Sequence, residues 1–359
     1  MAATRTYSFV GEPDPALAPF VEELAKGLER HGFDRVDDPT YSDVVLNLID
    51  PESPKPFRRK SQGTFVAAVF ASDREPEDGL RENYPMLVRA LSNIALLYVP
   101  GKGAYFTTME RGHYVVPENG DGPSMSERVL ERLLPLAQSK LIIENEFRTD
   151  LEEELWDGDE LTEEMKEVGK RLDSLGLLPA PFPIEELLSE RELRHVMRLY
   201  SIGGLSYGNL SARKDDTRFW MSASGVDKGN LEIPGRDMLL VTGFDSEHGR
   251  MVLSVPPNVE PRRVSVDAIE HWIIYRENPE VKAILHIHAW MEGIPATEIN
   301  FPCGTAELAS SVAALIADED DPGTAVVGLL NHGITATGES LTEILDRIEP
   351  RLLMQVPMV

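Results

Sequence analysis

The sequence predicts an α/β protein built from two parts. The chain has 359 residues, more than one small domain usually needs. In its first part, short apolar runs alternate with segments of helical periodicity. Near its middle, residues 177–183 read LLPAPFP, whose three prolines favour a stiff, extended segment. We therefore expect an α/β domain over residues 1–148, an acidic helix and Pro-rich linker over 149–183, and a second domain over 184–359.

The elements of the first part follow from its hydrophobic pattern. Apolar side chains recur at helical spacing in the predicted helices, whereas continuous apolar runs are typical of strands buried on both faces. The predicted strands are 6–10, 44–49, 64–70 and about 95–99, the predicted helices are 14–31, 81–97 and 126–146, and a hairpin is predicted over 104–116. The alternation of strands and helices favours a parallel sheet with Rossmann-like layering. Neither G-x-G-x-x-G nor G-x-x-x-x-G-K-[ST] is present, so the sequence shows no nucleotide fingerprint.

The charge balance limits the classes of partner. There are 61 acidic and 35 basic residues, giving a net charge of −26. Nucleic acid and anionic membranes select clustered Lys and Arg, so we expect neither as a partner. The negative charge does not exclude a small phosphorylated substrate, because binding one needs only a local pocket. Residues 150–171 are dense in acids and are predicted to be a solvated helix or connector, with a docking surface as the alternative.

Cysteine content and targeting signals narrow the setting further. Cys303 is the only cysteine, so the chain has neither an intramolecular disulfide nor a Cys-rich zinc site. No apolar run has the length of a signal peptide or a membrane span. We therefore expect a cytoplasmic protein, in which any metal is held by histidines and carboxylates.

The strongest chemical signal is a set of three histidines. His286 and His288 lie two apart in an apolar run, VKAILHIHAW, which predicts a strand. Residues two apart on a strand point to one face, so both imidazoles can reach one ion. His332 follows another apolar run and precedes Gly333. Three histidines with an open position fit a catalytic metal site, although H-x-H alone also fits histidines satisfied within a core.

Two further clusters accompany the histidines. Ser265 is placed to cap a helix predicted over 267–277, and Asp267 in its first turn is a candidate base or metal ligand, or else a plain helix-start acid. Residues 207–213 (YGNLSAR) and 219–231 (FWMSASGVDKGNL) are expected to be turns between β-prone runs. Such turns present backbone N–H groups and hydroxyls to anions.

Together these clusters resemble the class II aldolase/adducin family over about 175 residues, roughly 184–359. The matching order is GN-x-S, S-x-SG, a Ser-bearing helix start with an acid, H-x-H and NHG, and the segment LLNHGITATGESLTEILDRIE is similar to the family's third-ligand strand and following helix. The resemblance implies an α/β/α domain around a mostly antiparallel central sheet. It also implies a small-molecule substrate and a homo-oligomer, with a tetramer favoured.

The resemblance assigns roles to particular residues. It implies a divalent ion, most often Zn²⁺ with Mn²⁺ or another ion possible, held by His286, His288 and His332. It implies Asp267 as the catalytic carboxylate beside the metal, either the base or a fourth ligand. A substrate phosphate would then be held by Gly208, Asn209, Ser224, Gly225 and Ser265.

This sequence departs from the family pattern in its proton-transfer residues. Val266 stands where a second hydroxyl residue is common, and no tyrosine follows Tyr275, although the family's aldolases and epimerases use late tyrosines as general acids. Glu292 and Glu298 lie in the short segment after His288 and are candidates to replace the missing tyrosines as general acids. The favoured interpretation, however, is that both are surface acids. The Arg58-Arg59-Lys60 run of the first part similarly reads as a solvated turn rather than an anion site.

The sequence therefore favours a divalent-metal-dependent lyase of aldolase type, acting on a small hydroxy-carbonyl compound that can be phosphorylated, through a metal-stabilised enediolate. An epimerase, dehydratase or decarboxylase would use the same metal site and is the first alternative. A non-catalytic adducin-like binding module is the second, and metal content discriminates it from an enzyme.

Overall fold

The computed structural model describes residues 5–60, 64–108, 112–120, 122–175, 188–192, 194, 208–354 and 356–357. The chain divides into two compact units. The first comprises Met1–Ser139, Phe182–Leu193 and Met358–Val359, and the second comprises Lys140–Pro181 and Arg194–Pro357. This division differs from the expected boundaries, because the acidic segment after residue 148 belongs to the second unit. The Pro-rich stretch 177–183 lies outside the described residues.

A seven-stranded sheet organises the first unit, in the order β2-β1-β3-β4-β5-β6-β7. Its strands are β1 (Arg5–Val10), β2 (Phe33–Arg35), β3 (Val44–Leu48), β4 (Phe65–Ala71), β5 (Ile94–Val99), β6 (Gly103–Thr108) and β7 (His113–Pro117). The first five strands in that order pair in parallel, whereas β6 and β7 add antiparallel. Strand β3 is fully buried and β4 nearly so, which explains their continuous apolar sequences.

The helices of the first unit are shorter than their apolar patterns predict. They are α1 (Ala18–Arg30), α2 (Gly79–Ala90) and α3 (Met125–Gln138), with a short 3₁₀ helix, η1 (Pro39–Tyr41). The helix predicted over 81–97 ends at Ala90, because Leu91 adopts a left-handed φ of 56° and closes it. The helix predicted over 126–146 ends at Gln138, where Ser139 turns extended.

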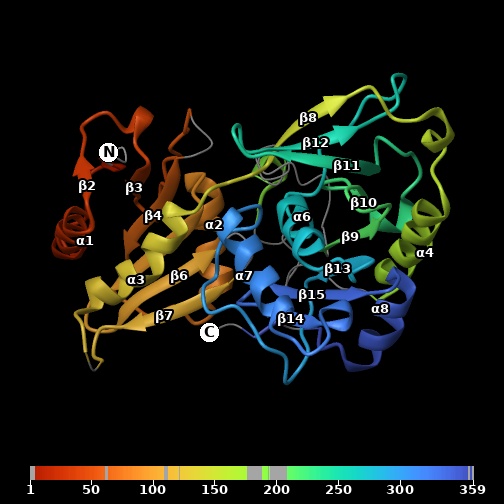
Figure 1. Ribbon diagram of the computed structural model, residues 1–359. Helices are drawn as coiled ribbons and strands as arrows, with labels where there is room; N and C mark the ends of the chain where they lie inside the picture. The colour runs from red at the N-terminus through yellow and green to blue at the C-terminus, as the bar shows by residue number, and fades with distance from the viewer. Residues whose placement is uncertain are drawn as a thin grey trace. The chain divides into compact units, whose positions relative to one another are not determined.

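The second unit is built on an eight-stranded sheet, in the order β14-β15-β13-β9-β10-β11-β12-β8. Its strands are β8 (Glu144–Arg148), β9 (Gly208–Arg213), β10 (Phe219–Ser222), β11 (Met238–Asp245), β12 (Arg250–Ser254), β13 (Ala283–Ile287), β14 (Val326–Leu329) and β15 (Gly333–Gly338). Every neighbouring pair is antiparallel except β12 and β8, which are parallel. Figure 1 shows β8 in yellow beside β12.

Helices cover both faces of this sheet. They are α4 (Glu160–Ser174), α6 (Ala268–Glu277), α7 (Ala306–Ala317) and α8 (Leu341–Ile348), and the short 3₁₀ helices are η2 (Glu153–Leu155), η4 (Lys228–Asn230), η5 (Pro322–Thr324) and η6 (Glu349–Arg351). Ser211 of β9 contacts α6. Residues 335 and 338 of β15 point to opposite faces; Thr335 contacts α6, whereas a Cβ on Gly338 would meet Ile344 of α8. Helix α7 packs beside α6, and α4 packs beside α8.

The acidic segment is a packed amphipathic helix rather than a solvated connector. Asp159 caps α4 by accepting hydrogen bonds from the backbone of Leu161 and Thr162. Met165, Val168 and Leu172 form its buried stripe and belong to the hydrophobic core of the second unit. The acids occupy the remaining face, so their density concealed the apolar stripe from the sequence interpretation.

The expected mixed α/β composition is confirmed for both units. Within the part of the chain that the structure describes, no helix is both long enough and apolar enough to cross a membrane.

Candidate metal centre

The three predicted histidines converge in the second unit. His286 lies on β13, His288 follows it by two residues, and His332 lies in the turn between β14 and β15. One ring nitrogen from each lies within 4.8 Å of the others. The Nε2 atoms of His288 and His332 are 3.2 Å apart. Asn331 supports this turn with a φ of 57°, a left-handed conformation that Asn adopts more readily than most residues.

One histidine has the surroundings expected of a metal ligand. His286 is 1% exposed. Its Nδ1 lies 3.3 Å from the Thr335 hydroxyl, while its Nε2 is buried with no hydrogen-bond partner among the described residues. A buried, unpartnered nitrogen is costly unless something binds it. Metal-bound histidines typically present one nitrogen to the ion and fix the other through a hydrogen bond, so the arrangement fits a divalent ion.

Burial shapes the electrostatics of the histidines. It lowers the pKa of His286 to about 4, against a hydrogen bond to the Ile334 backbone that acts in the opposite direction. Burial also lowers the pKa of His271, on α6, well below its usual value, and the charge of His286 adds to this effect. Imidazoles that resist protonation remain available as neutral nitrogen ligands.

Strand register places His286 between two polar side chains. It pairs with Asn209 on β9 and with Thr335 on β15. Gly208, next to Asn209, has a φ of +127°, and a Cβ there would lie 1.9 Å from the His286 carbonyl oxygen. Only glycine fits so close to β13. Residues 208–213 are thus a strand, not the expected turn.

Asp267 is held beside the histidine strands. It lies at the N-terminus of α6 and is 6% exposed, and its Oδ2 accepts a 2.7 Å hydrogen bond from the Asn209 amide. Burial raises its pKa to about 6, against the hydrogen bonds from Asn209 and the Gly304 backbone. The helix has no side-chain cap, so the predicted capping role of Ser265 is wrong; its carbonyl instead accepts from the Ala268 N–H.

Two charged residues near the centre were missed by the sequence interpretation. Glu270 of α6 is 2% exposed, and its Oε1 accepts a 2.7 Å hydrogen bond from Thr335 Oγ1. Burial, followed by the nearby charge of Asp267, raises the pKa of Glu270 to about 8. Lys228 is 1% exposed, and burial lowers its pKa to about 8, against the charges of Asp267 and Asp227. Sequence analysis missed them because a Glu in a predicted helix and a Lys in a Gly-rich turn are usually surface residues.

The loop after His288 contributes a thiol rather than an acid. Sγ of Cys303 lies 3.4 Å from Nε2 and 3.7 Å from Nδ1 of His332. Glu292 and Glu298 are exposed, in line with the surface reading of both. The lone cysteine excluded disulfides in the sequence, but no sequence pattern pointed to its place beside His332.

Three of the predicted anion-binding residues, Ser224, Gly225 and Ser265, lie on two adjoining segments. Ser224 and Gly225 follow β10, and the Ser224 N–H donates to the Arg263 carbonyl. The Ser265 N–H donates to the Ser222 carbonyl, so the two segments run side by side. Gly208 and Asn209 lie on the neighbouring strand, where the Asn209 amide is directed to Asp267. Their part in holding a substrate phosphate stays a prediction.

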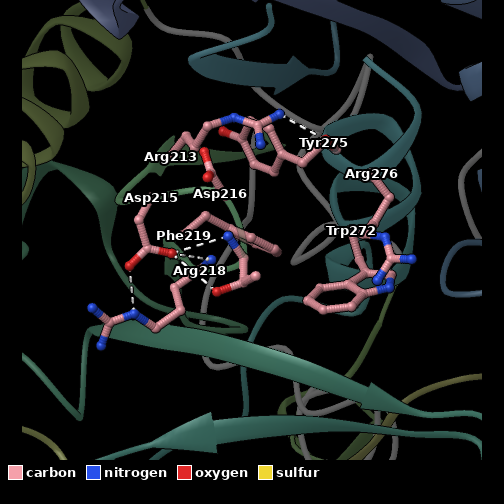
Figure 2. A pocket seen from close by; sticks show the side chains of 9 residues that line it. Arg213, Asp215, Asp216, Arg218, Phe219, Trp272, Tyr275 and Arg276 are labelled. Carbon is pink, nitrogen blue, oxygen red and sulfur yellow. Dashed lines mark hydrogen bonds and ion pairs between the residues drawn. The ribbon is translucent and has the colours of Figure 1, made fainter. Parts of the chain in front are cut away.

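A small hollow elsewhere in the unit does not belong to this centre. Figure 2 shows it between Arg213, Phe219, Trp272 and Tyr275. Arg213 ends β9, whereas Gly208 and Asn209 begin it, so the hollow and the histidines lie at opposite ends of that strand. The Arg213 guanidinium donates to the backbone carbonyls at the end of α6 and after it. These hydrogen bonds give Arg213 a structural role.

Comparison with known proteins finds a family match in the middle of the chain. Residues 192–297 match the family described as the Class II Aldolase and Adducin N-terminal domain. This match confirms, over that range, the resemblance to the class II aldolase/adducin family that the sequence motifs indicated. The matched range includes His286, His288 and Asp267, and His332 follows it.

Relatives with this domain are enzymes. The chain is 26% identical over 187 residues to the 3-oxo-tetronate 4-phosphate decarboxylase of Haemophilus influenzae, which covers 46% of this chain and 81% of that enzyme. It is 26% identical over 148 residues to the L-fuculose phosphate aldolase of Methanococcus maripaludis, covering 34% and 78%. It is 36% identical over 83 residues to the methylthioribulose-1-phosphate dehydratase of Klebsiella pneumoniae, covering 23% and 34%.

A solved L-fuculose 1-phosphate aldolase overlaps 54% of this chain and 81% of its own, at 19% identity and a TM-score of 0.37. The three relatives found by sequence are a decarboxylase, an aldolase and a dehydratase, and they support the conclusion that this protein is an enzyme.

Proposed function

We propose that this protein is a divalent-metal-dependent lyase that acts on a small phosphorylated hydroxy-carbonyl compound. The observation that carries the proposal is the convergence of one ring nitrogen from each of three histidines, together with the buried, unpartnered Nε2 of His286. The names of the relatives support the substrate class, because each acts on a sugar phosphate or a related phosphate.

The histidines would hold the ion, and the chemistry would take place at its open side. A bound divalent ion would polarise a carbonyl and its neighbouring hydroxyl. Zn²⁺ suits a three-histidine set, and Mn²⁺ is the second choice. His286 would bind through Nε2, since its Nδ1 faces Thr335.

Asp267 is the residue we assign to proton transfer. Its Oδ1 is buried with no hydrogen-bond partner among the described residues, whereas Oδ2 is fixed by Asn209. A pKa raised by burial to about 6 brings this carboxyl close to neutral pH, where a group can both take and return a proton. Asn209 holds the carboxylate in place, and the adjacent Gly208 lets β9 pack closely against β13.

The phosphate of the substrate would be held by the two adjoining segments. Ser224, Gly225 and Ser265 supply hydroxyls and backbone near the start of α6, where the helix dipole favours an anion. Val266 in place of a second hydroxyl leaves this subsite with one donor fewer than the family pattern.

Metal content tests the proposal, followed by a substrate panel. Wild-type protein should hold about one ion per chain, and His286→Ala/His288→Ala should hold none while keeping its secondary structure by circular dichroism. The metal-loaded wild type should then cleave or dehydrate ketose phosphates or decarboxylate an oxo-acid phosphate, and the double variant should not. A wild type that binds neither Zn²⁺ nor Mn²⁺ would refute the enzyme and favour an adducin-like binding module.

We also propose a homo-oligomer, with a tetramer favoured, in the cytoplasm. Light scattering coupled to size exclusion checks the assembly, and a mass near 40 kDa, that of one chain, would contradict it.

A further inference from the structure

A buried acid behind the metal centre has no role in the function proposed above. Glu270 lies on α6, three residues after Asp267, and is 2% exposed. Its Oε1 accepts from Thr335, while its Oε2 is buried with no hydrogen-bond partner in the described part of the chain. Burying a carboxyl group costs several kcal/mol unless it is compensated, so an apolar side chain would stabilise this position better. The acid therefore calls for an explanation other than folding.

The hydrogen bonds from Glu270 lead to one metal ligand. Thr335 Oγ1 donates its only proton to Glu270 Oε1, at 2.7 Å. The hydroxyl then offers lone pairs to His286 Nδ1, at 3.3 Å, and this contact is favourable only if Nδ1 carries the proton. The hydrogen bond from His286 to the Ile334 backbone requires the same tautomer, because Nε2 has no partner among the described residues. A neutral imidazole protonated at Nδ1 has its free lone pair on Nε2, the buried nitrogen without a partner.

We propose that Glu270 is a positioning residue for the metal: acting through Thr335, it fixes the ring orientation and tautomer of His286 so that Nε2 faces the ion. This inference rests on the proposed function for the presence of the ion. Hydrogen bonds to the outer nitrogen of a ligating histidine set its geometry and basicity, and losing one typically weakens metal binding about 10- to 100-fold.

Strand and helix geometry make the contact specific. Thr335 and His286 are paired residues of β15 and β13, so their side chains share one face of the sheet. Helix α6 covers that face and brings Glu270 to it. Glu277, near the end of the same helix, is exposed and has no such contact among the residues described, which makes it a matched control.

Metal affinity and stability test the inference together. Zn²⁺ and Co²⁺ affinities are measured by chelator competition for wild type, Glu270→Leu, Thr335→Val, Thr335→Ser and Glu277→Gln. We expect Glu270→Leu and Thr335→Val to bind both ions about 10-fold or more weakly, with an altered visible spectrum of the bound Co²⁺. Thr335→Ser keeps the hydroxyl and should restore the affinity and the spectrum. Glu277→Gln should match wild type.

The metal-free proteins separate positioning from a structural role. Glu270→Leu should be at least as stable as wild type, because it removes a buried acid, even though it binds metal more weakly. A variant that loses stability and affinity together would indicate a structural role and overturn the inference.

The double variant tests whether the two residues act through one another. Glu270→Leu/Thr335→Val should bind metal about as weakly as the weaker single variant, because both substitutions break the same path. Fully additive losses would contradict the path. If wild type binds an ion and the two single variants bind it equally well with an unchanged spectrum, the inference fails and the proposed function stands. If wild type binds no ion, both fail.

Discussion

The close approach of β9 to β13 makes a sharp prediction for Gly208→Ala. The backbone at Gly208 has a φ of +127°, and an added Cβ would lie 1.9 Å from the His286 carbonyl oxygen. A side chain in that backbone region costs about 1–3 kcal/mol. Forcing the strands apart to remove the overlap costs roughly another 1–3 kcal/mol. We therefore expect the free energy of unfolding of the second unit to fall by about 2–6 kcal/mol.

Gly249→Ala is the control for the backbone term alone. Gly249 also has a positive φ, of +65°, but a Cβ there would meet nothing within 4 Å. Its substitution should cost only about 1–2 kcal/mol. The difference between the two variants thus contains the overlap with His286 and any extra backbone cost at the larger φ of Gly208.

Intrinsic fluorescence provides the assay, because Trp156, Trp220, Trp272 and Trp290 are the four tryptophans of the chain and all lie in the second unit. Urea unfolding followed by this signal reports that unit. Gly208→Ala should also weaken metal binding, since the displaced strand carries Asn209, whereas Gly249→Ala should not. Equal losses of stability in the two variants would show that β9 does not approach β13 as described.

Three further predictions concern the core, the strand end and pH. Met165→Ala should lower the free energy of unfolding of the second unit by about 2–5 kcal/mol, because it leaves a cavity in the core. The exposed Lys170→Ala is the control and should cost less than about 0.5 kcal/mol. Both are measured by urea unfolding, and equal effects would mean that α4 is not packed. Arg213→Lys should cost about 1–3 kcal/mol in the same assay, because lysine cannot reach three carbonyls in a fixed fork. In metal-free protein, Glu270→Gln should gain stability relative to wild type as pH rises from about 5 to 9. The folded-state pKa of Glu270 is raised to about 8, so its contribution is present below its ordinary value of 4.5 and is lost as pH rises through 8. A stability difference that does not change across this range would contradict the raised pKa.

Local periodicity predicted the parts of the site that lie on one short segment. His286 and His288 were predicted to share a face because a strand repeats every two residues, and their nitrogens do converge with that of His332. Strand β8 escaped detection because its sequence, ENEFR, is mostly polar and exposed, as suits a strand at the sheet edge. Edge strands depend on a neighbour more than on their own composition.

Local sequence patterns could not predict residues whose contacts lie on other helices or strands. Glu270 follows Asp267 by three positions on α6, and nothing in that spacing shows that both are buried. Its contact with Thr335 depends on helix α6 covering β15, which is a tertiary property. In the sequence, Cys303 only excluded disulfides, because it is the single cysteine. Its position beside His332 is visible only in the fold.

Under the proposed function, the pairing of Asn209, His286 and Thr335 across three strands would also tie metal binding to correct assembly of the sheet. These residues are separated by 77 and 49 positions in the chain, yet they occupy one row of the sheet. A slip of one residue in either neighbouring strand would turn its polar side chain to the opposite face and leave His286 beside an apolar one. Recovery of metal affinity during refolding would therefore report native strand register, which far-ultraviolet circular dichroism alone does not distinguish.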